Sequence, residues 1–200
     1  MPRIKEDLTH TIEIKKSRFI TYLHRTDSEE EARDFIKFIK KKHPDATHHC
    51  TALVIGDLTR SNDDHEPAGT AGHPMLNVLL KQEMDQICAV VVRYFGGIKL
   101  GTGGLVKAYS DSVKEALAQA TLTTVSLWKE YVLTFDYPWI GKIDAALHRM
   151  DCQIESKDYD QKVVYHVLSA QDLKTSLMEL TQGQCTCEFV QEKAHETVLY

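Results

Sequence analysis

The sequence lacks any long hydrophobic segment. No uninterrupted apolar run among its 200 residues approaches the ~18 residues that a membrane-spanning helix needs, and the residues after Met1 contain no apolar signal-peptide core. Cysteine is scarce too: the 5 cysteines are an odd number at irregular positions and do not resemble a disulfide framework. We therefore expect a soluble, unexported protein of the cytoplasm that has no membrane partner.

The sequence also lacks an excess of positive charge. It contains 24 lysines and arginines against 29 aspartates and glutamates, and the net charge of −5 lies entirely after residue 125, where 7 basic residues face 12 acidic ones. Both numbers argue against a polyanion binder held by bulk charge, so any nucleic-acid contact has to be local. The hydrophobic share of 42% excludes a disordered or collagen-like chain, and the length suffices for two small cores.

No catalytic or nucleotide-binding fingerprint is complete. The string that begins Gly101-x-Gly103 has Val106 where the dinucleotide fingerprint needs glycine or alanine, and no P-loop string occurs. The string that begins at His65 has Gly69 where a zinc metalloprotease has its second histidine. We therefore assign no catalytic residue, no metal and no cofactor.

The first 125 residues predict an α/β domain. The continuous apolar run from Cys88 to Val92 is typical of a strand covered on both faces, and a long polar loop is expected from Gly56 to Gly72. Strands are expected at 10–14 and 18–23, joined as a hairpin, and at 51–55 and 88–92. Helices are expected after a Ser28–Glu31 capping box, from Pro74, and over 105–117.

The last 75 residues predict the order strand, helix, strand, strand, helix, strand. Alternating apolar residues mark strands at 131–135, 154–159, 162–168 and 185–189. Pro138 opens the first helix, and a Ser169–Asp172 pair is expected to cap the second. This βαββαβ order is that of a ferredoxin-like domain. The sequence thus predicts an α+β protein with domains at 1–125 and 126–200.

Glycine is concentrated in one segment, because five of the 10 glycines lie between Gly96 and Gly104. Such clustering means that the backbone needs positive φ there or that something approaches it closely. A strand, a glycine-rich turn and a helix N-terminus in succession place free N–H groups where a phosphate can bind. The alternative is a tight turn with a purely structural role.

Four other groups each have two interpretations. The run Asp63 to Glu66 either binds a metal or acts as acid and base, or it is an ordinary polar loop. The run His48-His49-Cys50 and the pair Cys185-x-Cys187 either contribute to a nucleophilic or zinc site or place small hydrophobic residues on core strands. Arg93, at a strand end, either pairs with a carboxylate or points into a cleft near the glycines.

Two segments of the sequence resemble a known family. They are Asp63-Asp64-His65-Glu66-Pro67-Ala68-Gly69-Thr70-Ala71-Gly72 and Val91-Val92-Arg93-Tyr94-Phe95-Gly96-Gly97-Ile98-Lys99-Leu100-Gly101-Thr102-Gly103-Gly104-Leu105. Both resemble the signature of the IMPACT family in its YigZ-like bacterial branch, over roughly residues 10 to 120. The remaining residues resemble the ferredoxin-like C-terminal domain of bacterial members. One departure is visible, since the family usually has glycine where this chain has His65.

The resemblance implies an N-terminal α/β sandwich of the type found as the fourth domain of elongation factor G, followed by a domain like that factor's fifth. This pairing implies contact with the ribosome or with structured RNA, by analogy of fold. Eukaryotic relatives are linked to control of translation through a stress-activated kinase and its activator. They use an additional RWD domain, so we do not expect that mechanism here.

Two hypotheses follow. In the first, a non-enzymatic cytoplasmic protein regulates translation by binding the ribosome, RNA or a translation factor through the glycine-rich turn, with cationic side chains on phosphates and Tyr94 or Phe95 stacked on a base. In the second, an enzyme or a protein that binds a small anion or nucleotide uses the same cleft. The candidate binding residues are His48, Asp63, Asp64, His65, Glu66, Thr70, Arg93, Tyr94, Phe95, Gly96, Gly97, Lys99, Gly101, Gly103, Gly104 and Lys107.

Overall fold

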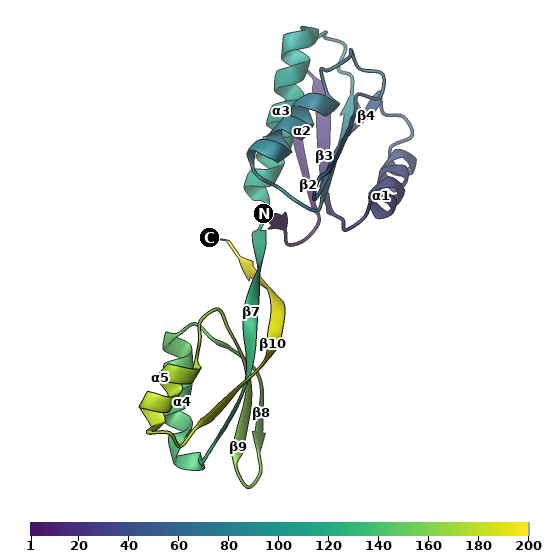
Figure 1. Cartoon of the computed structure of the whole chain (residues 1–200). Helices are drawn as coiled ribbons and strands as arrows, with labels where there is room; N and C mark the ends of the chain where they lie inside the picture. Colours follow the sequence, from purple (N-terminus) through teal and green to yellow (C-terminus); the bar gives the residue numbers. More distant parts are fainter. Residues whose placement is uncertain (200) are drawn as a thin grey trace. The chain divides into compact units, whose positions relative to one another are not determined.

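The computed structural model describes residues 1–199, and these form two compact units (Figure 1). Unit 1 comprises Met1–Thr124, to which the chain returns at Val198, and unit 2 comprises Val125–Thr197. Each unit has a mixed sheet-and-helix architecture with its own buried cluster of apolar side chains. The predicted α+β class with two domains is confirmed.

Unit 1 is built on an antiparallel sheet with the strand order β2-β3-β6-β4-β5. The strands are β2 (Leu8–Ile14), β3 (Ser17–Arg25), β4 (His48–Ile55), β5 (Leu58–Asn62) and β6 (Ile87–Tyr94). The predicted hairpin of β2 and β3 is confirmed, with Leu8 opposite Leu23 and Ile14 opposite Ser17. Strand β6 lies between β3 and β4, and all its residues before Tyr94 are buried. This central place explains its uninterrupted apolar sequence.

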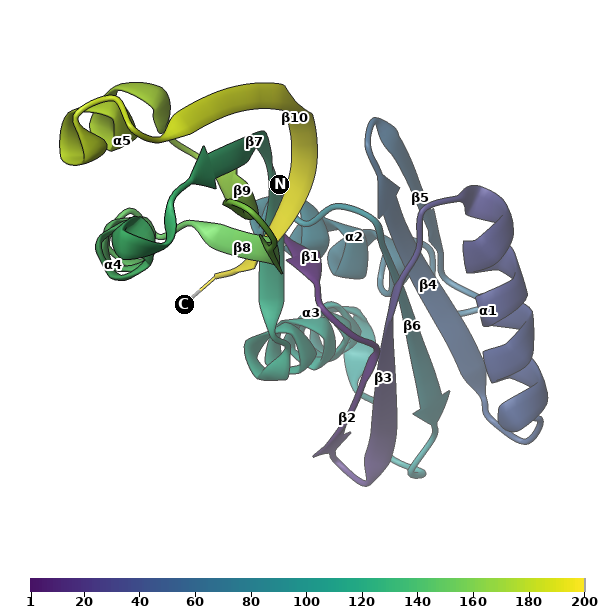
Figure 2. The ribbon, with the colours of Figure 1, turned by 90° about the horizontal axis from the view of Figure 1, so that it is seen from below.

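Helices cover both faces of this sheet (Figure 2). The helices α2 (Gly72–Lys81) and α3 (Gly101–Gln119) lie on one face, and α1 (Glu29–Lys42) lies on the other. The predicted cap of α1 is confirmed, since Ser28 Oγ accepts the backbone N–H of Glu31 at 3.2 Å. The larger core lies between the sheet and the pair α2–α3, and a smaller cluster lies under α1.

Both ends of the chain join unit 1 at one segment. The short β1 (Arg3–Ile4) pairs with the start of β7 (Leu122–Phe135), with Arg3 opposite Thr123. The N–H of Lys5 donates to Thr121 O and the N–H of Leu199 donates to Leu122 O, each at 2.8 Å. The backbone from Thr121 to Thr123 therefore fastens the first and the last described residues of the chain.

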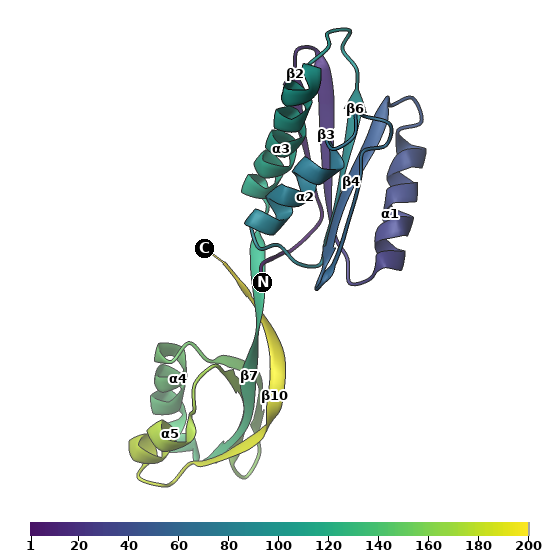
Figure 3. The ribbon, with the colours of Figure 1, turned by 45° about the horizontal axis from the view of Figure 1, so that its top comes forward.

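Unit 2 has the predicted βαββαβ order (Figure 3). Its sheet order is β10-β7-β9-β8, and both α-helices cover one face. A 3-10 turn, Tyr137–Trp139, carries the predicted Pro138 and leads into the first helix. The elements after β7 are α4 (Ile140–Arg149), β8 (Gln153–Tyr159), β9 (Val163–Ser169), α5 (Lys174–Thr181) and β10 (Thr186–Val198).

Three predicted details are wrong. The expected loop from Gly56 to Gly72 contains β5, an exposed edge strand. Its polar sequence lacks the apolar alternation by which a strand is predicted. Helix α3 begins at Gly101 rather than at 105, because glycine disfavours helix interiors but is tolerated in a first turn. Ser169 and Asp172 do not cap α5, which begins at Lys174 after a local turn that both side chains stabilise.

Candidate functional site

A pocket of about 470 Å³ opens in unit 1 where four segments meet. These segments are the start of β4, the loop between β5 and α2, the end of β6 and the start of α3. The lining residues are Thr47, His48, Glu66, Pro67, Arg93, Phe95, Lys99, Leu100, Gly101, Thr102 and Leu105. The two segments that carry the family resemblance thus supply most of the wall of one pocket.

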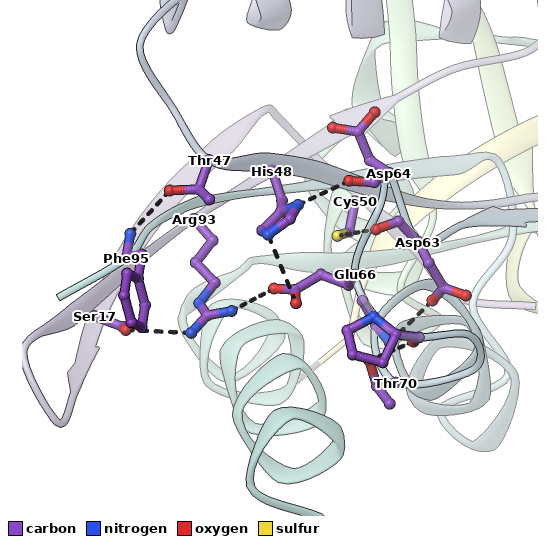
Figure 4. A network of polar contacts seen from close by, with 12 residues as sticks. Ser17, Thr47, His48, Cys50, Asp63, Asp64, Glu66, Thr70, Arg93 and Phe95 are labelled. Carbon is purple, nitrogen blue, oxygen red and sulfur yellow. Dashed lines mark hydrogen bonds and ion pairs between the residues drawn. The ribbon is translucent and has the colours of Figure 1, made fainter. Parts of the chain in front are cut away.

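The floor of the pocket is an ion pair (Figure 4). Arg93 Nη1 donates to Glu66 Oε1 at 2.6 Å, and the two side chains are only 6% and 3% exposed. Arg93 Nη2 also reaches Ser17 Oγ at 3.4 Å, and the guanidinium carbon lies 5.5 Å from the centre of the Phe95 ring. Arg93 therefore pairs with a carboxylate, which is the first of the two interpretations given above. Its charge is not available as a free cation.

Glu66 is held by a second donor and faces a histidine. The hydroxyl of Tyr109 donates to Glu66 Oε1 at 2.7 Å. Burial, with the neighbouring Cys50 and Glu66, raises the pKa of Tyr109, so its hydroxyl remains a donor. His48 Nε2 lies 3.7 Å from Glu66 Oε2, while His48 Nδ1 lies 2.8 Å from the carbonyl oxygen of Asp64 and must carry the proton of that hydrogen bond. Among described residues, Oε2 accepts no hydrogen bond.

Asp63 and Asp64 organise the loop and do not line the pocket. Asp63 accepts the backbone N–H groups of Gly69, Ala71 and Gly72 at 2.8–3.0 Å. Burial opposes ionisation, but these hydrogen bonds outweigh it and lower the pKa of Asp63. Asp64 binds Lys40 Nζ and the N–H of His49, which lower its pKa against the same opposition from burial.

Two further loop residues, His65 and Thr70, also serve the loop conformation. The exposed His65 has φ +70°, in the left-handed region that favours glycine. Glycine, the residue expected here from the resemblance, adopts this conformation without strain. The Thr70 hydroxyl donates to the carbonyl of Pro67 at 2.6 Å.

The glycine segment meets both expectations placed on it. Gly97 and Gly101 have φ values of +84° and +75°. A Cβ on Gly96 would collide with the backbone of Lys16 and Ser17 in the β2–β3 turn. Gly103 and Gly104 lie in the first turn of α3, and no side chain caps this helix. Its first N–H groups are therefore free of intrahelical partners at the rim of the pocket.

The aromatic and cationic candidates differ in availability. Phe95 is 46% exposed at the pocket wall, whereas the hydroxyl of Tyr94 bonds to His43 at 2.8 Å. Lys99 is exposed and lines the pocket, whereas the exposed Lys107 pairs with Asp111 at 2.7 Å. Phe95, whose ring also meets the Arg93 guanidinium, is thus the partly exposed aromatic residue of the pocket, and Lys99 is its exposed cation without an ion pair among residues 1–199.

Cys50, Cys185 and Cys187 are buried thiols whose surroundings disfavour the nucleophilic thiolate. Cys50 Sγ donates to the carbonyl of Asp63, and burial raises its pKa to about 12. Burial likewise raises the pKa of Cys185 to about 11 and that of Cys187 to about 12. Among residues 1–199 no cluster of three or more histidine, cysteine or acidic side chains is arranged to hold a metal, and no helix is long and apolar enough to cross a membrane.

Sequence reasoning missed several residues that build the pocket. Ser17 and Tyr109 anchor Arg93 and Glu66, and Thr47 Oγ1 accepts the N–H of Phe95 at 3.1 Å. Leu100 and Leu105 supply apolar wall. Leu100 and Leu105 lie in the second segment that carries the family resemblance, but Ser17, Thr47 and Tyr109 have no local signal, because only the tertiary fold brings them to the pocket.

Comparisons with known proteins agree with this architecture. Residues 15–117 match the model of the Impact N-terminal domain, and residues 133–184 match a domain of unknown function, DUF1949. The IMPACT family member YvyE of Bacillus subtilis is 43% identical over 189 residues, which are 90% of this chain and 87% of that protein. The member YigZ of Escherichia coli is 48% identical over 160 residues, 78% of each chain.

A solved structure supports the same conclusion. The crystal structure of a hypothetical protein is 40% identical to this chain, covers 96% of it and 98% of its own chain, and has a TM-score of 0.61. The family model spans about half of the sequence, and both named relatives align with more than three quarters of it. On these grounds the chain belongs to the IMPACT family.

Proposed function

We propose that this protein regulates translation in the cytoplasm without being an enzyme, and that it binds single-stranded RNA, in the ribosome or free, through one face of unit 1. This pocket face consists of the pocket, Phe95, Lys99 and the β2–β3 turn at Lys15 and Lys16. Family membership favours the translational role, because eukaryotic relatives are linked to control of translation. The resemblance to two domains of elongation factor G favours RNA as the partner.

The observation that carries the proposal is the combination of a partly exposed aromatic ring with free cations. Single-stranded RNA is bound by stacking of bases on aromatic rings and by cations along the backbone. Phe95 offers such a ring, and Gly96 packs the Lys15–Lys16 turn against the same segment. Both turn lysines and Lys99 are exposed and form no ion pair within residues 1–199.

The charge balance of the chain limits this contact to the pocket face. The nearby carboxylates are already engaged, since Glu66 pairs with Arg93 and Asp64 with Lys40. Glu13 is the exposed acidic residue on the same hairpin. A few local lysines acting against an overall negative charge give modest, strongly salt-dependent affinity.

Sedimentation with ribosomes and separated subunits over a series of salt concentrations tests the proposal. We expect Lys99→Ala to weaken binding and to reduce the slope of log affinity against log salt by about 1. Lys81→Ala is the matched control, because Lys81 is also exposed but ends α2 away from the pocket. Binding that ignores salt, or that falls equally in both variants, would contradict the proposal.

The pocket itself favours a second candidate, a small ligand or nucleotide held without RNA. Of the polar side chains expected to face such a ligand, His48 and Glu66 do line the pocket. A ligand bound only by the folded state stabilises it by about 2.7 kcal/mol at a hundredfold excess over Kd. A thermal-shift screen of nucleotides and metabolites measures this, and a screen without any shift would remove this candidate.

A further inference from the structure

The geometry points to the pocket as a site for a single nucleobase whose edge carries an amino group, as cytosine and adenine do and uracil does not. This inference rests on the proposed binding of single-stranded RNA and adds to it which base is held and by which atoms. Three parts of the pocket match the three parts of a nucleotide: its walls, its floor and its rim.

The walls match the flat apolar body of a base. Phe95 is half-exposed beside the opening, and Pro67, Leu100 and Leu105 complete an apolar lining. The volume of about 470 Å³ lies within the range of pockets that hold small organic ligands. Proteins that read single-stranded RNA place bases against such aromatic walls and use polar groups for the base edge.

The floor determines which base edge fits. Arg93 and Tyr109 occupy Oε1 of Glu66, which leaves Oε2 as an acceptor at a pocket-lining residue. A carboxylate oxygen accepts from an amino group such as N4 of cytosine. Uracil presents a carbonyl oxygen at that position, and two facing acceptors repel each other. Glu66 therefore selects for the amino group.

His48 supplies the second hydrogen-bonding atom of the floor. Its Nδ1 is committed to the Asp64 carbonyl, so Nε2, 3.7 Å from Glu66 Oε2, is the atom left to meet a ligand. With the ring proton on Nδ1, Nε2 is an acceptor like Glu66 Oε2, so the floor as a whole favours a base edge that donates hydrogen bonds. Uracil presents the O4 carbonyl to this floor and is disfavoured there, whereas the amino group of cytosine or adenine is accepted.

The rim matches the phosphate of the same nucleotide. Gly101 and Thr102 begin the 19-residue helix α3, which has no side-chain cap, and both line the pocket. Free N–H groups and the helix dipole favour an anion there. Lys99 adds a cation at the same edge. The apolar walls and polar floor, which do not depend on this helix end, indicate a base rather than a bare phosphate.

Fluorescence anisotropy with labelled ten-nucleotide oligo(C) and oligo(U) tests the inference on the full chain. The two oligonucleotides share a backbone and differ at the base edge that Glu66 would read. We expect the wild type to bind oligo(C) about tenfold more tightly, and Glu66→Gln to bring the ratio near one because its amide also donates. Equal binding by the wild type, or an unchanged ratio in Glu66→Gln, would overturn the inference.

Phe95→Ala provides a variant that leaves the buried ion pair intact. Loss of one stacked base should weaken both oligonucleotides about 5- to 150-fold while keeping the preference for oligo(C). The matched control is Phe38→Ala, because Phe38 is 59% exposed on α1 and does not line the pocket. If Phe95→Ala and Phe38→Ala bind the oligonucleotides with equal affinity, the base does not bind at Phe95. This comparison remains decisive even if Glu66→Gln unfolds.

Free nucleotides separate failure of this inference from failure of the proposed RNA binding. If neither ribosomes nor oligonucleotides bind, the proposed function fails. The base site is then tested by measuring the melting temperature with cytidine and uridine 5′-monophosphates. If only the cytidine nucleotide raises the melting temperature of the wild type, and it does not raise that of Phe95→Ala, the pocket is a base site whose ligand is a free nucleotide. Equal or absent shifts with the two nucleotides would overturn it.

Discussion

The buried arginine illustrates how a charge can serve architecture rather than contact. Arg93 is the penultimate residue of the central strand, where an exposed arginine would suit a phosphate. Instead its guanidinium is 6% exposed and bonded to Glu66 and Ser17, and it lies within 5.5 Å of the centres of two phenylalanine rings. It fixes the carboxylate of Glu66, and that carboxylate in turn determines the polarity of the pocket floor.

We predict that Arg93→Ala lowers the free energy of unfolding by about 3–5 kcal/mol, because it leaves the carboxylate of Glu66 buried without its partner. Urea unfolding at pH 7 measures this loss. Lys99→Ala, at an exposed neighbour, should remain within about 0.5 kcal/mol of the wild type. A loss below about 1 kcal/mol for Arg93→Ala would mean that solvent reaches Glu66. For this reason Lys99, and not Arg93, is the informative position for binding experiments.

A second prediction concerns backbone strain at His65. Its φ of +70° lies in the left-handed region. This backbone conformation costs most residues other than glycine about 1–2 kcal/mol. Glycine removes the strain but adds unfolded-state entropy, so His65→Gly should raise the free energy of unfolding by about 1 kcal/mol. Ala68→Gly, in the same loop and without a positive φ, should lower it slightly. Equal effects of the two substitutions would show that φ at His65 costs nothing.

At the scale of elements, the pocket depends on two contacts between segments far apart in sequence. The backbone of the β2–β3 turn contacts Gly96. The carboxylate of Asp63 accepts three backbone N–H groups from the residues that precede and begin α2. The first contact positions the turn before α3, and the second shapes the loop that delivers Glu66. Each can be removed by one substitution.

Gly96→Ala should destabilise the protein by several kcal/mol, about 2 or more, because the new methyl group meets the backbone of Lys16. Gly103→Ala is the control: a Cβ there meets nothing within 4 Å, and alanine in a helix is favoured by up to about 1 kcal/mol. Thermal unfolding of the two variants should shift in opposite directions. A stable Gly96→Ala protein would mean that the β2–β3 turn moves freely.

Asp63 should make stability depend on pH. The pKa of its carboxyl group is lower in the folded protein than in the unfolded chain, so its contribution is present above the unfolded pKa of about 3.9 and is lost as the pH falls through the folded value. We expect Asp63→Asn to lower the free energy of unfolding by about 2 kcal/mol at pH 7. The difference from the wild type should shrink below pH ~4, and a constant difference would show that the charge is irrelevant.

Much of this architecture follows from local sequence, and the pocket does not. The cap at Ser28, the buried run in β6 and the alternation in β7 each indicate their element from neighbouring residues alone. The exposed strand β5 escapes such reasoning because its pairing with β4, rather than its own composition, makes it a strand. The partnership of Glu66 with Arg93 and Tyr109 joins residues 27 and 43 positions apart, and no spacing rule predicts it.

At the scale of the whole molecule, the two units have separate cores. The apolar clusters of unit 1 contain no residue of unit 2, and the reverse also holds. Leu79 and Leu147 are both fully buried, one in each unit. Each can therefore report on its own core.

We predict two unfolding transitions that respond separately. Leu79→Ala should lower the transition of unit 1, and Leu147→Ala that of unit 2, each by about 2–5 kcal/mol. Differential scanning calorimetry measures both transitions in one experiment. Substitutions at sites without shared partners have independent effects, so a single transition lowered by either variant would instead show cooperative unfolding of the whole chain.

The fastening of both chain ends at Thr121–Thr123 has a practical consequence. Helix α3 runs 19 residues from the pocket rim to this segment, a distance of about 28 Å at 1.5 Å per residue. A fluorophore, affinity tag or surface tether attached at either end of the chain is therefore anchored well away from the pocket mouth. We expect a ligand to bind equally well to protein immobilised through either end, because both attachments leave the pocket open.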